Sequence, residues 1–550
     1  MPAAAPLRAR GVTVVRGAAT VLDGVDLVVP AGERIGVVGP NGVGKTTLLR
    51  ALAGEVTLEA GRVVRTPPTA TVGYLPQEPS RSPAETIRSY LARRTGVAAA
   101  ATELDAATTD LAADSDCAGE RYAAALEHWL ALGGPDLEAR TGQVWSDLGL
   151  PAGLLDEPTA SLSGGEAARA SLAALLLARF DVFLLDEPTN DLDLDGLDRL
   201  ERWINGLNEA GVVLVSHDRT FLARTVTRVV ELDEFTHRAT EFGGGWSGYL
   251  AEREAARRHA WDRFEEYDDQ RRTLSRRAQR EREWAAQGRA RVRRSDEPDK
   301  NIRAYKINQT EQLAGRAART ERAIERLDVV DKPREPWQLR LSVPSPGRSG
   351  DIVARLDGAV VERGAFRLGP IDLTVGAGER IALLGANGSG KTTLLDALLG
   401  RAELAAGRRS IGPSVVPGEV EQARDRLHGT DSLLRAFQAE TRWDAADVRT
   451  LLAKFGLVAD HVTRPAGTLS PGERTRASLA LLMANGANTL VLDEPTNHLD
   501  LPAIEQLEAA LDGFDGTLLL VTHDRSLLDH VRLTREIELV GGHVVRDEPR

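Results

Sequence analysis

Two glycine-rich loops carry the residues whose types and spacing point most directly to chemistry. The segments GPNGVGKTT and GANGSGKTT place glycines, a lysine and two threonines at the same intervals, each directly after a short apolar stretch. Glycines allow successive backbone N–H groups to turn inward around phosphate oxygens, where larger side chains would clash. The lysine of such a loop reaches the terminal phosphates, and the first threonine offers its hydroxyl to Mg²⁺. The candidate phosphate-binding residues are Gly39, Pro40, Asn41, Gly42, Val43, Gly44, Lys45, Thr46 and Thr47 in the first loop and Gly385, Ala386, Asn387, Gly388, Ser389, Gly390, Lys391, Thr392 and Thr393 in the second.

Two acidic motifs, DEPTNDLD and DEPTNHLD, supply the carboxylates that hydrolysis of a phosphate bond requires. Each motif follows a short apolar run that predicts a buried strand. A carboxylate at the carboxyl end of a strand can hold Mg²⁺ through water, which makes Asp186 and Asp493 candidate metal ligands together with Thr46 and Thr392. The next residues, Glu187 and Glu494, are placed to polarise an attacking water as general bases.

A histidine follows another predicted strand in each half, within the segments SHD and THD. His217 and His523 could reach the terminal phosphate of a bound nucleotide. A surface-loop histidine is the alternative, which is disfavoured because both copies carry the residue. We interpret the DEPT segment at 156–159 as a loop, since it follows no strand, and we reject Ser216-His217-Asp218 as a hydrolase triad because triads converge in space and not along the sequence.

The motifs recur in the same order, and their spacing reveals an internal duplication. Gly32-Glu33-Arg34 and the first glycine-rich loop recur 346 residues later, whereas LSGGE at 162–166 matches LSPGE at 469–473, only 307 residues later. The first copy therefore holds an insertion of about 38 residues between Gln77 and Leu162. Helix-compatible apolar spacing predicts a helical arm at about 97–132, and Gly133-Gly134-Pro135 ends it. We expect an α/β fold with two tandem P-loop domains, at 1–245 and 340–550.

Length and composition are those of a multidomain protein that remains in the cytoplasm. The chain has 550 residues, 42% hydrophobic residues, a formal charge of −12 and a single cysteine, Cys117, which rules out an internal disulfide. No apolar run reaches the roughly 18–20 residues needed to cross a bilayer. The segment Met1–Arg10 lacks the apolar core of a secretory signal, so we expect a cytoplasmic protein.

The segment 246–339 between the two copies differs from both, because it reads as two long charged helices. We expect one helix from Trp246 to about Gln287, an exposed tip at about 288–300, and a second helix at 301–327 that runs back. From Gln270 to Lys306 there are thirteen Arg or Lys residues against five Asp or Glu, a balance of +8 within an acidic chain. This excess favours contact with nucleic-acid phosphates. The alternative is a solvated helix pair whose charges satisfy one another.

The full set of motifs, present twice, resembles twin ATP-binding-cassette domains. The resemblance implies that Ser163 and Gly165 contact the ATP held at Lys391, and that Ser470 and Gly472 contact the ATP held at Lys45, by pairing of the cassettes within one monomer. It further implies that Gln77 and Gln422 touch Mg²⁺ and the attacking water. Two departures stand out: Pro471 replaces a signature glycine, and Arg16-Gly17 and Arg363-Gly364 stand where an aromatic residue usually stacks on the base. A guanidinium group can also stack on a base.

Fusion of two cassettes through a long charged linker, without a membrane segment, resembles the ABC-F proteins. Gly245–Tyr249, Glu283-Trp284 and Gly288–Arg291 are similar to that family's linker, and 310–327 resembles its antibiotic-resistance branch. The resemblance implies an ATPase that uses ATP and Mg²⁺, binds rRNA and tRNA on the ribosome through 246–339, and protects the ribosome from an antibiotic. It implies no transmembrane partner. The alternatives are a housekeeping translation factor, the ATPase subunit of an antibiotic exporter, or a nucleic-acid repair ATPase.

Overall fold

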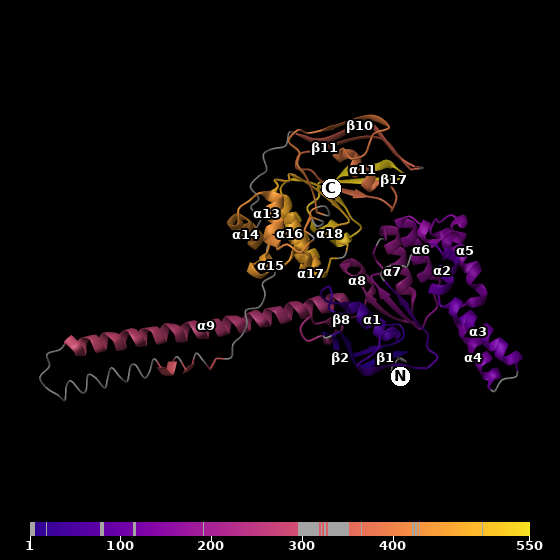
Figure 1. Cartoon of the computed structure of the whole chain (residues 1–550), viewed down its shortest axis with the longest axis horizontal. Coiled ribbons are helices and arrows are strands. Elements are labelled where there is room, and N and C mark those ends of the chain that lie inside the picture. The colour runs from indigo at the N-terminus through magenta and orange to yellow at the C-terminus, as the bar shows by residue number, and fades with distance from the viewer. Residues whose placement is uncertain are drawn as a thin grey trace. The chain divides into compact units, whose positions relative to one another are not determined.

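The computed structural model divides into two compact units, one formed by Met1–Trp246 with Trp337–Arg550 and the other by Ser247–Pro336. The first unit contains both copies of the duplicated motifs, and the second is the linker that the sequence predicts at 246–339 (Figure 1). The residues that the structure describes are 6–17, 19–76, 82–113, 117–190, 192–294, 318–320, 322–323, 326–327, 351–364, 366–420, 423, 426–427, 429–497 and 499–550.

A six-stranded sheet forms the centre of the first cassette, in the order β5-β6-β7-β3-β8-β9. Its first five strands are parallel, and β9 pairs antiparallel with β8 at the edge. β6 and β7 are buried along their whole length, which explains their uninterrupted apolar sequences, because helices cover both faces of such a sheet. The strands are β3 (Arg34–Val38), β5 (Val72–Leu75), β6 (Val182–Asp186), β7 (Gly211–Val215), β8 (Arg228–Leu232) and β9 (Ala239–Phe242).

A smaller antiparallel sheet, in the order β2-β1-β4, covers the helix that follows the first glycine-rich loop. Side chains along β2 alternate between buried and exposed, as expected for a sheet with one face on the core. The core between the layers includes Leu22 and Leu27 from β2, Leu48 and Leu49 from α1, and Val213 from β7. The elements are β1 (Leu7–Arg16), β2 (Ala19–Val29), β4 (Ala60–Arg65) and α1 (Lys45–Ala53).

The insertion that the motif spacing predicts at 97–132 contains two helices, α3 (Val97–Ala112) and α4 (Ala118–Ala131), which lie side by side (Figure 1). In the DEPT segment at 156–159, Asp156 ends one 3-10 helix and Thr159 begins the next, and the segment follows no strand. The remaining helical elements of this cassette are α2 (Ile87–Arg94), η1 (Gly134–Asp136), α5 (Leu137–Asp147), η2 (Ala152–Asp156), η3 (Thr159–Ser161), α6 (Gly164–Leu177), α7 (Leu194–Gly206) and α8 (Arg219–Thr225).

The second cassette repeats this topology, with sheets in the orders β14-β15-β16-β12-β17-β18 and β11-β10-β13. The expected α/β fold with two tandem P-loop cassettes is confirmed. The strands are β10 (Ile352–Arg363), β11 (Phe366–Gly376), β12 (Arg380–Leu384), β13 (Ala406–Ile411), β14 (Pro417–Glu419), β15 (Thr489–Asp493), β16 (Thr517–Val521), β17 (Arg535–Val540) and β18 (His543–Pro549). The helices are α11 (Lys391–Leu399), α13 (Leu433–Thr441), α14 (Ala445–Lys454), α15 (Ala459–Thr463), η4 (Ala466–Thr468), α16 (Pro471–Ala484), α17 (Leu501–Asp512) and α18 (Arg525–His530).

The linker unit is built on one long helix, α9 (Gly245–Arg294), of 50 residues. At 1.5 Å per residue its length is about 75 Å. The helix end predicted near Gln287 was wrong, because α9 continues through Gly288 to Arg294. One glycine costs a helix only about 1 kcal/mol, and the arginine and alanine residues that follow it are strong helix formers. Residues 295–300, the rest of the predicted tip, lie outside the described residues.

Most of the predicted return helix at 301–327 also lies outside the described residues, but a short helical piece at 318–320 is described. The hydroxyl of Thr320 donates a 2.9 Å hydrogen bond to Glu281 Oε2 on α9, and both side chains are buried. A contact between residues 39 positions apart is the kind that an antiparallel helix pair makes.

A buried arginine anchors the strand that carries the second glycine-rich loop. The Arg380 guanidinium donates to the backbone carbonyl oxygens of Leu511 at 2.8 Å, Phe514 at 2.5 Å and Arg532 at 2.5 Å. These carbonyls lie at or just beyond the carboxyl ends of α17 and α18, where a cation is favoured by the helix dipole. Arg34, at the matching position of the first cassette, donates its Nε–H to Thr225 O at 2.6 Å.

We expect Arg380→Met to destabilise the second cassette by about 3 kcal/mol, because it removes the charged donor that three backbone carbonyls share. The matched variant Arg34→Met should cost less, since that guanidinium is only partly buried. Hydrogen–deuterium exchange of the amides in α17 and α18, compared with those in α7 and α8, measures the difference. Equal effects of the two variants would contradict this account.

Candidate active site

The first glycine-rich loop joins β3 to α1 in a form that only glycine allows at its ends. Gly39 has φ of 148°, and a Cβ there would lie 2.8 Å from Leu232 O. Gly44 has φ of 114° and stands at the N-cap of α1 without a capping side chain. The first N–H groups of α1 are therefore free of a side-chain cap, and this helix end is suited to binding an anion.

Each loop lysine folds back over its own loop. Lys45 Nζ donates to Gly39 O at 2.8 Å and Pro40 O at 3.1 Å. Lys391 Nζ donates to Gly385 O at 2.7 Å and Ala386 O at 3.1 Å. Burial lowers the pKa of both lysines, while nearby carboxylates raise it. These carbonyls hold each ammonium group beside the backbone N–H groups of the loop, where both can bind phosphate oxygens.

A hydroxyl and a carboxylate meet beside each loop. Thr392 Oγ1 donates to Asp493 Oδ2 at 2.7 Å, and a hydrogen bond from Thr46 similarly stabilises the ionised form of Asp186. Burial nevertheless raises the pKa of Asp186 overall. Hydroxyl and carboxylate oxygens are the hard donors that Mg²⁺ prefers, so these pairs fit that ion. Tyr74, which we did not predict, donates to Asp186 Oδ2 at 3.2 Å.

The two candidate bases, Glu187 and Glu494, lie beside the candidate histidines in strained backbone conformations. Glu187 has φ of 51° and Glu494 has φ of 48°, left-handed values that cost a non-glycine residue about 1–3 kcal/mol. Each glutamate N–H donates to a carbonyl of the neighbouring strand, Val215 O at 3.0 Å or Val521 O at 2.9 Å. This bond helps to hold the turn that presents the glutamate side chain at the end of the sheet.

Each glutamate contacts the histidine of its own cassette. Glu187 Oε1 lies 3.0 Å from His217 Nε2, and Glu494 Oε1 lies 3.3 Å from His523 Nε2. Burial raises the pKa of Glu494 to about 8 and lowers the pKa of His523 to about 4. A carboxyl group whose pKa lies near neutrality is suited to accept a proton from water as a general base.

The LSGGE and LSPGE segments form the N-termini of α6 and α16 through matching capping boxes. Ser163 Oγ accepts from Glu166 N at 3.4 Å while Glu166 Oε2 accepts from Ser163 N at 2.9 Å. Ser470 and Glu473 repeat the arrangement. Pro471 stands at the first helical position, where its missing N–H has no intrahelical partner to lose. The departure from the usual glycine is therefore compatible with the helix.

Contacts between the cassettes bring the motifs of one half to the loop of the other. A Cβ built on Gly165 would lie 3.1 Å from Asn387 Cβ in the second loop. Asn387 N donates to Asp193 Oδ2 at 3.1 Å, and Asn41 N donates to Asp500 Oδ2 at 3.2 Å. Neither Asp193 nor Asp500 was among the predicted site residues. The signal for them was the LD that ends each DEPTN motif.

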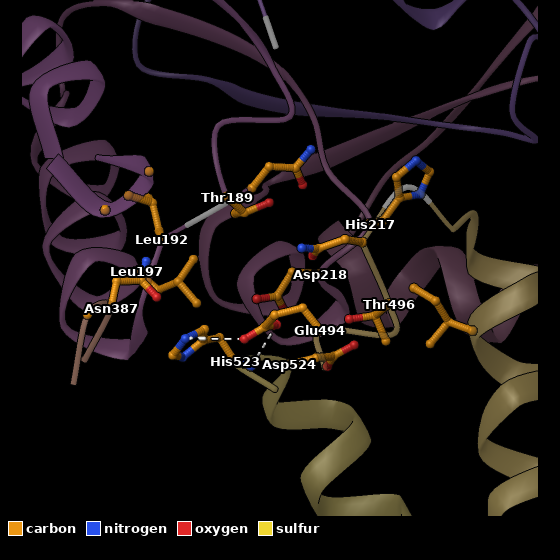
Figure 2. Close-up of a pocket in the computed structure, with 16 residues that line it drawn as sticks. Thr189, Leu192, Leu197, His217, Asp218, Asn387, Glu494, Thr496, His523 and Asp524 are labelled. Carbon is orange, nitrogen blue, oxygen red and sulfur yellow. Dashed lines mark hydrogen bonds and ion pairs between the residues drawn. The ribbon is translucent and has the colours of Figure 1, made fainter. Parts of the chain in front are cut away.

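A cavity of about 370 Å³ lies between the two cassettes. Residues from both halves line it, among them Gly165 and His217 of the first and Asn387, Glu494 and His523 of the second. Figure 2 shows Glu494 beside His523 and Asp524, with Asp218 of the other cassette close by. With Gly388, which also lines it, the structure therefore brings six of the predicted site residues together around one cavity.

An aromatic residue lies against the second loop, at a position we did not predict. Phe366 Cζ would lie 2.8 Å from a Cβ on Gly390. Phe366 pairs with Arg363 in the β10–β11 hairpin, whereas Ala19 pairs with Arg16 in the β1–β2 hairpin. Arg363 itself is engaged with Asp396 at 2.8 Å. The second site therefore has a phenyl ring beside its loop, and its hairpin arginine is held by a carboxylate.

Gln77 and Gln422, the candidate residues for touching Mg²⁺ and the attacking water, lie outside the described residues. Among the residues that are described, no helix has the length and apolar character required to cross a membrane.

The chain matches the ABC transporter family at residues 22–190 and 368–497. It is 35% identical to the tylosin resistance ATP-binding protein TlrC of Streptomyces fradiae, over 95% of each chain. It is 31% identical to ABC transporter F family member 5 of Arabidopsis thaliana, over 95% of this chain and 73% of that protein. The chain belongs to the ABC-F family.

Another relative of this ABC-F protein is the energy-dependent translational throttle protein EttA of Haemophilus influenzae, 30% identical over 93% of this chain and 88% of that protein. The two cassettes bind ATP, and the protein is an ATPase, as the motifs predicted.

Two adjacent glycines of this ABC-F protein allow a matched test of the interface. We expect Gly165→Val to lower ATP hydrolysis at the second loop at least about tenfold, because the new side chain would displace Asn387 and a small misplacement is costly to catalysis. Gly164→Ala meets no atom within 4 Å and should hydrolyse ATP at nearly the wild-type rate. The rates are measured as phosphate release in a Glu187→Gln background. Equal losses in both variants would argue against this interface.

Proposed function

We propose that this ABC-F protein binds the ribosome in the cytoplasm and protects it from a ribosome-targeting antibiotic. TlrC, whose name records tylosin resistance, carries this proposal because its similarity extends over 95% of each chain. The match therefore includes the linker as well as the two cassettes.

The charge of α9 supports a nucleic-acid partner for the linker. Two of its arginines form pairs within the helix, Arg272 with Asp268 at 2.9 Å and Arg277 with Glu281 at 3.1 Å. The Arg272 pair is partly exposed, and such pairs contribute little stability and exchange readily for phosphate contacts, whereas Glu281 is buried and also accepts a hydrogen bond from Thr320. Between Gln270 and Glu283, the arginines with exposed side chains are Arg271, Arg272, Arg276, Arg277, Arg280 and Arg282.

The proposed reaction is hydrolysis of ATP held between the cassettes. Lys45 and Lys391 bind the terminal phosphates, and Ser163 with Gly165 or Ser470 with Gly472 contact the nucleotide from the opposite cassette. Mg²⁺ would be held by Thr46 and Asp186 or by Thr392 and Asp493, together with Gln77 or Gln422, and would neutralise phosphate charge. Glu187 and Glu494 accept a proton from the attacking water, while His217 and His523 contact the terminal phosphate. ATP binding favours the ribosome-bound state, and hydrolysis releases the protein.

A housekeeping role in translation is the second candidate. EttA, whose name describes a translational throttle, is 30% identical over 93% of the chain, so ribosome binding without drug resistance also has a relative in its favour. The two candidates share the ATPase chemistry and differ in what the linker does once the protein is bound.

We expect the double variant Glu187→Gln, Glu494→Gln to bind ATP without hydrolysing it, because an amide cannot accept the proton of water. The variant should sediment with ribosomes in the presence of ATP and block translation in a cell-free system. Raising the salt concentration should weaken the interaction steeply if arginine–phosphate contacts dominate. A variant that retains ATP but stays in the supernatant would sink the proposed ribosome partner.

Expression in a drug-sensitive host distinguishes protection from housekeeping. We expect the wild-type protein to raise the minimal inhibitory concentration of at least one ribosome-targeting drug several-fold, and the double glutamine variant to raise none, because protection requires cycling. The appropriate measurement is a panel of ribosome-targeting drugs that includes tylosin, the drug in the name of the relative TlrC. An unchanged concentration for every drug in the panel would favour the translation factor.

A further inference from the structure

An arginine two residues after the second histidine reaches across to the other cassette. Arg525 stands at the first position of α18. Its Nη1 lies 2.8 Å from Glu201 Oε1, and its Nη2 lies 2.7 Å from Asp198 Oδ1. Both carboxylates belong to α7 of the first cassette. The segment that carries His523 is thus tied by two charge-assisted hydrogen bonds to the opposite half.

The same contact occurs in the reverse direction. Arg219, two residues after His217, forms an ion pair with Glu508 on α17 of the second cassette. Glu201 is 8% exposed and Glu508 is 9% exposed, so both carboxylates are largely desolvated. Removing one partner of such a pair costs more than removing one partner of an exposed surface pair, because it leaves a buried charge poorly compensated.

The helices that receive these arginines also touch the phosphate-binding loops. α7 follows Asp193, which accepts from Asn387 N in the second loop, and α17 follows Asp500, which accepts from Asn41 N in the first. Asp193 and Glu201 lie eight positions apart, which spans about 12 Å of helix. Each helix therefore holds the opposite cassette at two points, its phosphate loop and its histidine segment.

Glu201 also has a partner within its own cassette. Arg224 Nη1 lies 3.2 Å from Glu201 Oε2, and this contact helps to keep the carboxylate in place on α7. His530 Nδ1 lies 3.9 Å from Glu508 Oε1, beyond hydrogen-bond distance, and 2.7 Å from Ser526 O. The arginines Arg219 and Arg525 are consequently the parts of the network that link one cassette to the histidine segment of the other.

We propose that Arg219 and Arg525 are positioning residues that set the first and second histidine segments, respectively, against the opposite cassette. Each ATP site is then complete only when the helix of the other half holds its histidine in place. The proposal rests on the roles proposed above for the glutamates and histidines. Each arginine would act on its ATP site through the histidine segment and not by direct contact with the nucleotide.

Single-site backgrounds test the assignment. In Glu187→Gln, where only the second site hydrolyses ATP, Arg525→Gln should lower the rate at saturating ATP roughly tenfold, with little change in KM, because a displaced group costs catalysis more than binding. In the Glu494→Gln background, where only the first site hydrolyses ATP, Arg219→Gln should lower the rate to the same extent. The crossed combinations, Arg219→Gln with Glu187→Gln and Arg525→Gln with Glu494→Gln, should lose distinctly less. Arg532→Gln, which breaks a pair with Asp512 inside one cassette, is the control and should match its background.

Exchanging the two charged residues of one ion pair distinguishes a positioning role of the arginine from a general loss of folding. Arg219→Glu alone places two carboxylates together and should lower the rate of the first site, whereas Arg219→Glu with Glu508→Arg should restore most of it. Equal losses at both sites for each arginine, or a double variant no better than the single one, would overturn the proposal. If the double glutamine variant of both bases still hydrolysed ATP at the wild-type rate, the proposed roles of Glu187 and Glu494 would fail instead, while the arginine contacts would stay open to test by cassette association.

Discussion

One carboxylate at the start of a helix organises each half of the ATPase unit. Asp193 caps α7 with one oxygen, at 3.0 Å from Gly196 N, and accepts from Asn387 N of the opposite loop with the other, at 3.1 Å. Asp500 does the same between α17 and Asn41. Because one side chain satisfies both its own helix end and the neighbouring cassette, the position of the helix and the position of the opposite loop cannot change independently. Gly165, which lies against Asn387, and the cross-cassette ion pairs belong to the same interface.

The central sheet of each cassette, more than the interface between the cassettes, determines where the catalytic carboxylates lie. Glu187 and Glu494 follow directly after buried strands and adopt left-handed backbone conformations that a glutamate would not otherwise favour. The hydrogen bond from each glutamate N–H to the neighbouring strand helps to offset that cost. The strained residue lies where the turn directs the carboxylate out of the sheet and towards the histidine in the loop after the neighbouring strand.

Much of the fold could be predicted because the duplication supplied an internal check on each motif. The two loops, the acidic motifs and the histidines all lie at strand ends, since apolar runs before them were long enough to form buried strands. Contacts such as Arg219 with Glu508 could not be predicted, because 289 residues separate the partners and neither belongs to a motif. The end of α9 was misjudged because Gly288 was given more weight than the helix-forming residues after it. Phe366 escaped notice since its place beside Gly390 depends on the hairpin register.

The contacts between the cassettes match in the two halves, whereas the surroundings of the two phosphate-binding loops differ. Duplication copied both members of each cross-cassette pair, so the interface is self-complementary in the way of a two-fold dimer, with Arg219 and Arg525 facing Glu508 and Glu201. The surroundings of the loops have diverged. Asp396, which holds Arg363 near the second loop, corresponds to Arg50 near the first, and Phe366 corresponds to Ala19. The matching cross-cassette contacts therefore lie beside two loops with chemically different surroundings, so a difference between the two ATP sites would have a source outside those contacts.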